Sequence, residues 1–175
     1  DCEKMLELAK AHGAKPVLRD KKYANDSVPM NQVYEHLAGL VSNEHVLYVH
    51  VTSPLLKDSS LQEAIAKYKN LSTEYNCLAT VKGMKEYLWN HHGAINYDPS
   101  NHPRSQDLEE VFALNFAINI ISKDLMLQQK NIIGTKPYLF PLSKIESIDI
   151  DEKEDFELAE LIFKNLKGVI KNERS

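Results

Sequence analysis

The sequence is poor in cysteine and has no long apolar run, and these absences exclude several classes of protein. Cys2 and Cys77 are the two cysteines of the 175-residue chain. They lie far apart and outside any metal-binding or redox spacing, which does not indicate a disulfide-stabilised fold. No apolar run approaches the ~20 residues that a membrane-spanning helix needs. We therefore expect reduced thiols, no contact with a membrane and a cytoplasmic location.

Positive charge is scarce as well. The formal net charge is −4 and no basic stripe runs along the chain. Broad electrostatic attraction to nucleic acid or to an anionic membrane is therefore not expected. The hydrophobic fraction of 43% and the charged fraction of 26% are ordinary for a soluble globular protein. A chain of this length can bury a core of its own, so we expect one domain over residues 1–175.

What the chain does contain is an alternation of helix and strand patterns. Apolar residues at helical spacing, with Ser27 and the capping box Ser59–Gln62 as expected N-terminal caps, predict four helices. β-branched and aromatic runs predict five strands. The helices are expected over 5–12, 27–41, 59–68 and 155–166, and the strands over 46–51, 77–81, 116–121, 138–140 and 145–150. This order predicts an α/β domain with a mainly parallel sheet.

Two polar segments follow predicted strands, and they are the first candidates for a site. Ligands of such sheets bind beyond the carboxyl ends of the strands, which here means Thr52 and Ser53 and the segment from Asp149 to Asp151. Side chains two residues apart on a strand point the same way, so both aspartates are expected on one face. Paired carboxylates can hold Mg²⁺. The alternative is structural, because Asp151–Glu154 also fits a capping box for the last helix.

Four patterns then occur in one order along nearly the whole chain. They occupy residues 19–26, 51–55, 103–108 and 148–160. Together they resemble the acylneuraminate cytidylyltransferase family, whose patterns are close to R-P-x-x-L-A-x-D, Q-P-T-S-P-L-R, P-R-x-Q and S-I-D-I-D-x-x-x-D-F-x-x-A-E. The resemblance implies a three-layer α/β/α, nucleotide-diphospho-sugar-transferase-like (Rossmann-like) fold with a mostly parallel sheet.

The resemblance also implies a reaction. The family transfers CMP from CTP to the anomeric hydroxyl of an acidic nine-carbon sugar and releases pyrophosphate. Asp149 and Asp151 match the family's magnesium-binding pair, which makes Mg²⁺ the expected cofactor and Asp151 a catalytic residue. Arg104 matches an arginine of the sugar site, and a guanidinium fork suits a carboxylate. The alternative for Arg104 is a surface arginine in a mobile loop.

The resemblance assigns further residues to substrate binding. Gln106 would contact sugar hydroxyls, although a solvated amide fits equally well. Arg19 matches an arginine on the nucleotide side, with a surface salt bridge as the alternative. Thr52 and Ser53 would line the pocket with their hydroxyls, although Thr-Ser-Pro is also an ordinary way to leave a strand.

Several positions depart from the family patterns. Asn115 matches the asparagine of the pattern N-G-A-I-Y, but Phe116 stands in place of its glycine and Asn119 in place of its tyrosine. His50 replaces a frequent glutamine, and Leu56 replaces an arginine. These departures fall on the sugar side, so a sialic, a legionaminic-type or another nonulosonic acid is expected. A related cytidylyltransferase acting on 3-deoxy-manno-octulosonate is an alternative.

Residues 84–108 form the longest irregular segment and are rich in His, Asn, Asp and Pro. His91, His92 and His102 lack acidic or thiol partners at ligand spacing, so we expect a loop or interface role and no zinc site. In the family, the equivalent excursion reaches into a second subunit. A homodimer with shared active sites is therefore expected.

The family's first strand, its basic Gly-rich loop and its second strand have no counterpart in the sequence, which begins at Asp1. Such a loop supplies backbone amides and cations to a triphosphate. In the family fold the two strands lie between those near Val17 and Val49, and without them two apolar strand edges would be exposed. We therefore expect that the 175 residues alone do not turn over. A truncated, non-catalytic binding or assembly domain is the rival hypothesis.

Overall fold

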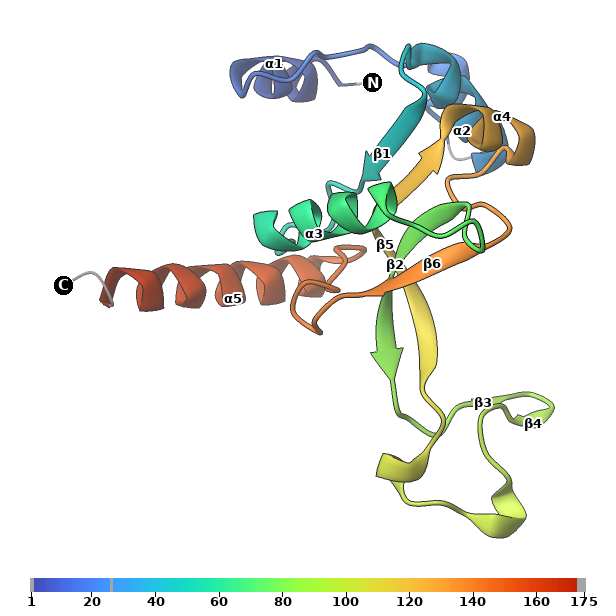
Figure 1. Cartoon of the computed structure of the whole chain (residues 1–175). Coiled ribbons are helices and arrows are strands. Elements are labelled where there is room, and N and C mark those ends of the chain that lie inside the picture. Colours follow the sequence, from blue (N-terminus) through green and yellow to red (C-terminus); the bar gives the residue numbers. More distant parts are fainter. Residues whose placement is uncertain (1, 26, 173–175) are drawn as a thin grey trace.

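The computed structural model describes residues 2–25 and 27–172, and it has the α/β architecture that the sequence predicts (Figure 1). Asp26, the last residue of the first pattern, lies outside the described residues. The helices are α1 (Glu3–Ala11), α2 (Met30–Leu40), α3 (Asp58–Lys69), α4 (Lys123–Gln129) and α5 (Lys153–Asn172). The strands are β1 (His45–Val49), β2 (Cys77–Met84), β3 (Trp89–Asn90), β4 (Gly93–Ala94), β5 (Val111–Ser122) and β6 (Pro137–Pro141). None of the helices in this part of the chain is both long and apolar enough to cross a membrane.

The central sheet has four strands in the order β1-β5-β2-β6. β2 and β6 are parallel, whereas β5 is antiparallel to both β1 and β2. Three strands therefore share one direction, as expected for a mainly parallel sheet. The insertion of β5 between β1 and β2 makes the sheet mixed, and the sequence pattern alone did not indicate this.

Helices cover both faces of the sheet, because successive residues of a strand point to opposite sides. Leu78 and Ile120 are cross-strand partners on the face that packs against α3. Cys77 and Ile121 are partners on the other face, where α2 and α4 pack. All four side chains are at most 4% exposed. The result is the expected three-layer arrangement with one apolar core on each face.

Three local predictions are wrong. Residues 145–150 do not form a strand, because the segment turns back on itself through the bonds Ser147 N–H to Ser143 O and Ile148 N–H to Ile145 O. Helix α2 begins at Met30 after Pro29, without a side-chain cap from Ser27. Helix α3 begins after Lys57 without a side-chain cap from Ser59.

Strand β1 lies at one edge of the sheet, and some of its apolar side chains are exposed. Within the described residues its only strand partner is β5. Leu47 and Val49 are each 41% exposed, and Val51 just beyond the strand is 88% exposed. Residues 14–20 form neither a helix nor a strand, and Val17 is exposed there. Apolar side chains thus remain uncovered along this edge.

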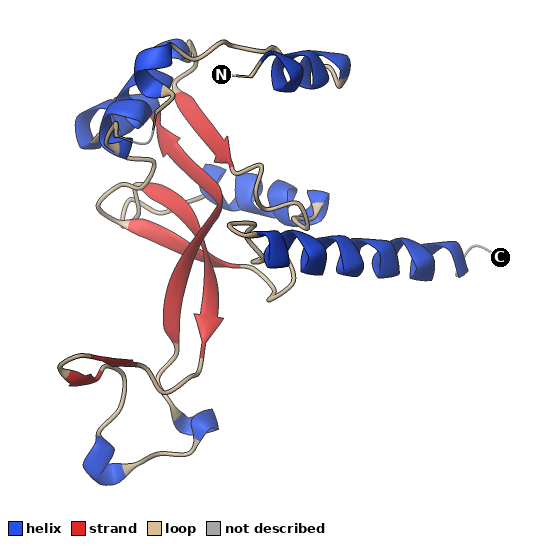
Figure 2. Cartoon of the chain, turned by 180° about the vertical axis from the view of Figure 1, so that it is seen from behind, coloured by secondary structure: helices blue, strands red, loops and turns tan. Residues whose placement is uncertain are grey.

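The segment between β2 and β5 forms an arm that extends away from the sheet (Figures 1 and 2). Its stem is a two-stranded ribbon in which Lys82 pairs with Ala113 and Met84 with Val111. Beyond the stem, β3 and β4 make a short hairpin, and two 3₁₀ turns follow at Pro99–Asn101 and Ser105–Asp107. The long irregular segment predicted from the sequence is therefore a structured projection.

Candidate functional site

The candidate site lies at the carboxyl end of β1, where the chain turns at Thr52 and Ser53. Ser53 is 6% exposed and Thr52 is half-buried. The backbone N–H of Ile150 donates to the carbonyl of Thr52 at 2.9 Å. Ile150 stands between Asp149 and Asp151, so this bond brings the predicted metal-binding segment against the predicted pocket residues. The aspartates reach this place on a turn, not on the strand that the alternation of Ile and Asp predicted.

Asn115 of β5 joins the same region through its side chain. Its Nδ2 donates to Ser147 Oγ at 3.0 Å, and Ser147 Oγ donates to the carbonyl of Ser143 at 2.9 Å. The Oδ1 atom of Asn115 accepts from the backbone N–H of Ala117 at 3.3 Å. Asn115 therefore ties β5 to the turn that precedes Asp149. Sequence reasoning did not single out Ser147, although Ser147 opens the pattern that contains the aspartates.

The residue after Asn115 has a backbone that explains the glycine of the family pattern. Phe116 has φ 55°, in the left-handed region that a side chain disfavours and that glycine adopts freely. Asn119 Nδ2 donates to the Phe116 carbonyl at 3.1 Å, and the Phe116 ring stacks on His50 at 6.0 Å between centroids. Three of the positions that depart from the family patterns thus contact one another.

A buried carboxylate that sequence reasoning missed fixes the turn. Glu146 is 4% exposed, and it accepts hydrogen bonds from Ser60 Oγ at 2.5 Å, Ser143 Oγ at 2.7 Å and Lys57 N–H at 3.4 Å. Burial raises the pKa of Glu146, but the bonds from Ser60, Ser143 and Lys57, together with the Lys57 charge, outweigh it and hold the pKa below its ordinary value. Because Lys57 precedes α3, Glu146 takes the place of the helix cap that Ser59 was expected to supply.

The two aspartates differ in their surroundings. Asp149 is half-buried, and its Oδ1 atom is buried without a hydrogen-bond partner. Asp151 is exposed. A buried, unpartnered carboxylate oxygen beside an exposed carboxylate fits the oxygen donor set that Mg²⁺ prefers when phosphates or water complete its shell. Within the described residues, no three His, Cys, Asp or Glu side chains gather as a metal site.

The capping alternative for Asp151 is wrong in its detail. The carboxylate that serves the start of α5 is that of Asp155, whose Oδ2 accepts from the backbone N–H groups of Glu152 at 3.0 Å and Asp151 at 3.2 Å. Asp155 therefore reaches back over the first turn, as the third residue of a capping box does. Among the contacts of the described residues, no bond of this kind engages the Asp151 side chain, so Asp151 does not cap α5 and its place in a metal site stays a prediction.

Arg19 comes near β1 from the extended segment before α2. Burial raises the pKa of the Tyr48 hydroxyl, and the charge of the nearby Arg19 partly offsets this rise. The Tyr48 ring packs edge-on against Tyr34 and is tilted against His50. Arg19 thus borders an aromatic cluster on the face of the sheet that α2 covers, close to the end of β1 where the site lies.

Arg104 and Gln106 are not brought together with the other predicted residues. Both lie in the arm, around the turn Ser105–Asp107. Arg104 makes an ion pair with Asp107, and the Gln106 carbonyl accepts from Lys85 Nζ at 3.4 Å. The arm also holds the three histidines considered above, and His102 there packs against the rings of Tyr87 and Tyr97.

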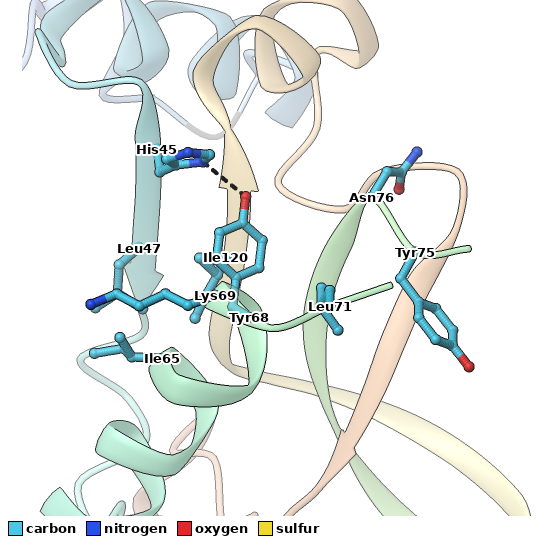
Figure 3. A pocket seen from close by; sticks show the side chains of 9 residues that line it. All are labelled: His45, Leu47, Ile65, Tyr68, Lys69, Leu71, Tyr75, Asn76 and Ile120. Carbon is cyan, nitrogen blue, oxygen red and sulfur yellow. Dashed lines mark hydrogen bonds between the residues drawn. The ribbon is translucent and has the colours of Figure 1, made fainter. Parts of the chain in front are cut away.

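A cavity lies elsewhere, at the other end of β1 (Figure 3). It has a volume of about 520 Å³ and is lined mostly by apolar side chains of β1, β5, α3 and the segment after α3. His45 Nδ1 and the Tyr68 hydroxyl lie 3.0 Å apart across it. None of the predicted site residues lines this cavity, which opens beside the uncovered edge of the sheet.

Comparison with known proteins agrees with the resemblance in the sequence. Residues 1–174 match the family described as cytidylyltransferase. An N-acylneuraminate cytidylyltransferase of Streptococcus agalactiae is 25% identical over 162 residues, which is 89% of this chain and 39% of that protein. A pseudaminic acid cytidylyltransferase of Campylobacter jejuni is 25% identical over 175 residues, which is 94% of this chain and 75% of that protein. The chain therefore spans about two-fifths and three-quarters of the lengths of these relatives.

A solved structure supports the fold. A 4-diphosphocytidyl-2C-methyl-D-erythritol synthase from Anaerococcus prevotii superposes with a TM-score of 0.61 at 11% identity, over 93% of this chain and 78% of that one. At this identity the likeness concerns the fold alone, and it agrees with the α/β class predicted from the sequence. With a family match along nearly its whole length, the chain belongs to the cytidylyltransferase family.

Proposed function

We propose that the protein transfers CMP from CTP to the anomeric hydroxyl of a nonulosonic acid and releases pyrophosphate. The observation that carries this proposal is the joining of Thr52, Asn115, Ser147 and Asp149 at the carboxyl end of β1, where ligands of α/β sheets bind. Relatives named for N-acylneuraminate and for pseudaminic acid give the substrate class.

The reaction requires alignment and charge neutralisation more than covalent assistance from the protein. Asp149 and Asp151 would hold Mg²⁺, which when bound neutralises charge on the phosphates. Thr52 and Ser53 would line the substrate pocket with their hydroxyls. Arg19 and its aromatic neighbours would border the nucleotide side. Glu146 and Asn115 would fix the turn that presents Asp149.

Arg104 and Gln106 would contribute to the site of a second copy. The ribbon from Val111 to Leu114 separates the arm from Asn115, and a paired strand advances by about 3.3 Å per residue. A paired ribbon cannot fold back onto its own sheet without breaking its hydrogen bonds. A homodimer in which each arm reaches the partner's site would resolve this separation. Exposed Trp89 and Ile95 on the arm supply apolar contact surface for such an assembly.

The direct test is pyrophosphate release from CTP with a panel of acidic sugars. The panel contains N-acetylneuraminic, legionaminic and pseudaminic acids, with 3-deoxy-manno-octulosonate as the competing class. Release that requires both CTP and a nonulosonic acid would support the proposal. No release with any sugar, from full-length protein that is folded by circular dichroism, would refute it and favour a non-catalytic role, whereas the 175 residues alone are expected not to turn over.

Sharing of the site has a separate test. Arg104→Ala and Asp149→Asn variants are each expected to be inactive alone. If each arm reaches the partner's site, a mixed dimer has one intact site of two. Random mixing makes half of the dimers mixed. Mixing the two variants is therefore expected to restore about a quarter of the wild-type activity. Absence of recovery after verified subunit exchange would contradict a shared site.

A further inference from the structure

The ion pair between Arg104 and Asp107 is side-on with respect to the guanidinium. Arg104 Nε donates to Asp107 Oδ2 at 2.7 Å, and Arg104 Nη2 donates to Asp107 Oδ1 at 3.3 Å. The carboxylate therefore holds the guanidinium from its side, through two of the five N–H groups that an arginine carries. Both oxygens of Asp107 are engaged in this contact.

The side-on contact leaves the other edge of the guanidinium available. The two Nη1 donors and the second Nη2 donor are not used in this pair, and one from each nitrogen points forward as a parallel fork. Such a fork matches the two oxygens of a second carboxylate. One arginine can thus be held by one carboxylate and can bind another.

The backbone that carries the pair is itself held. Asp107 N–H donates to the Arg104 carbonyl at 2.9 Å and closes the turn. The Tyr87 hydroxyl donates to the Pro103 carbonyl at 2.8 Å, which attaches the residue before Arg104 to the opposite leg of the arm. Leu108, directly after Asp107, is 3% exposed and anchors the other end of the turn. Without Asp107, the side chain would be the remaining mobile part, since Arg104 is 74% exposed.

We propose that Asp107 is a positioning residue that holds the Arg104 guanidinium with its free fork directed at the carboxylate of the sugar substrate. This inference rests on the proposed function for the identity of the ligand. An exposed ion pair contributes little to stability, so the gain from this one lies in orientation. Holding the guanidinium in place in advance lowers the entropy that is lost when the sugar carboxylate binds.

The test is steady-state kinetics of the purified full-length protein with CTP and the sugar that it uses best. Asp107→Ala is expected to raise the KM for the sugar about tenfold, because the Arg104 side chain must then be ordered when the sugar binds. The kcat and the KM for CTP should change little. Asp107→Asn keeps one acceptor for Nε–H, and its sugar KM is expected to lie between those of the wild type and Asp107→Ala. Asp98→Ala, which removes another exposed carboxylate of the same arm, is the matched control and should leave the sugar KM unchanged.

The Arg104→Ala background separates positioning from a general structural role. Because Arg104→Ala is expected to be inactive, sugar binding is measured in that background by calorimetry. Asp107→Ala is expected to have no further effect on the Kd for the sugar there, because its contribution acts through Arg104. An unchanged sugar KM in the single Asp107→Ala variant would overturn the proposal. A lowered sugar KM would overturn it as well, because it would mean that Asp107 competes with the substrate.

A second measurement is independent of turnover and separates failure of this inference from failure of the proposed function. The Nε proton of Arg104 is expected to exchange slowly with water in the wild type and in Asp98→Ala. Its signal is assigned by its loss from the ¹⁵N spectrum of Arg104→Lys. Faster exchange in Asp107→Ala alone would support the positioning even if no sugar were turned over. Equal exchange in all three proteins would refute it.

Discussion

Glu146 gives the sharpest test of how the fold builds the site, because one buried carboxylate joins the start of α3 to the turn before Asp149. Replacing it with alanine removes the acceptor for the Ser60 and Ser143 hydroxyls and for Lys57 N–H. A hydrogen bond to a charged group contributes about 1.5–3 kcal/mol, and a buried donor left without a partner costs about 1–3 kcal/mol. Water can reach Lys57 and the exposed Ser143, so we count the Ser60 bond in full and expect Glu146→Ala to lower the free energy of unfolding by about 2–3 kcal/mol.

The other substitutions in this series have graded expectations. Glu146→Gln keeps the volume and one carbonyl acceptor but loses the charge, so a loss of about 1–2 kcal/mol is expected. Ser60→Ala removes one of the two short bonds and should cost a similar amount. Ser59→Ala is the matched control, because the neighbouring Ser59 is exposed and caps nothing in α3, and its effect should stay below about 0.5 kcal/mol.

The pH dependence of the free energy of unfolding tests the role of Glu146 independently. The pKa of Glu146 lies below its ordinary value in the folded protein, so the ionised carboxylate stabilises the fold above the unfolded pKa. This contribution is lost as the pH falls through the lower, folded pKa. Urea melts of wild type and Glu146→Gln should therefore differ at neutral pH and converge in acid. Equal losses for Ser59→Ala and Ser60→Ala, or a difference that does not shrink in acid, would refute the role of Glu146.

Three further predictions concern the site and the arm. Asp149→Asn should leave the free energy of unfolding unchanged or raised, because Oδ1 has no partner to lose, while CMP-sugar formation falls by about 10²–10³-fold. Destabilisation in urea melts with intact activity would contradict this prediction. Phe116→Gly should be more stable than Phe116→Ala by about 1 kcal/mol in the same melts, because both lose the ring and only glycine adopts φ 55° without strain. The reverse order, which is usual in strands, would show that the strain is absent. Mg²⁺ titrated calorimetrically into the 175-residue chain should bind with a Kd in roughly the millimolar range, because no third protein ligand is present in the described part of the chain, and tight stoichiometric binding would contradict this.

Much of the fold follows from local pattern, and the failures have identifiable physical causes. The strands at 46–51, 77–81, 116–121 and 138–140 were predicted from β-branched and aromatic runs and are present with shifted ends. The antiparallel insertion of β5 depends on pairing between residues distant in sequence, which no local pattern encodes. The Ile–Asp alternation failed because a segment with period two becomes a strand only if a neighbouring strand pairs with it. Here the segment turns on itself, and the bond from Ile150 N–H to the Thr52 carbonyl joins it to the end of β1.

The candidate site also has residues that the sequence predicted and residues that it did not. Thr52, Ser53, Asn115 and Asp149 were predicted, and the fold brings them together. Glu146 was missed because its significance comes from Ser60, 86 residues away, and no spacing in the sequence marks such a contact. The expected cap at Ser59 failed for the same reason. A tertiary carboxylate had taken the position that local capping would have filled.

The distribution of unsatisfied polar atoms argues that the end of β1 serves function more than stability. Among the side chains of residues 2–25 and 27–166, the buried polar atoms without a partner are His36 Nε2, His50 Nε2, Asn119 Oδ1 and Asp149 Oδ1. Each such atom costs about 1–3 kcal/mol unless a ligand or an ordered water bonds to it. His50 and Asn119 both contact Phe116, whose backbone is itself strained, and Asp149 follows the turn tied to neighbouring Asn115. Strain and unpaired polar groups that gather at one place persist when binding there compensates their cost, and this end of the sheet is where Thr52, Asn115 and Asp149 of the proposed nucleotidyl transfer lie.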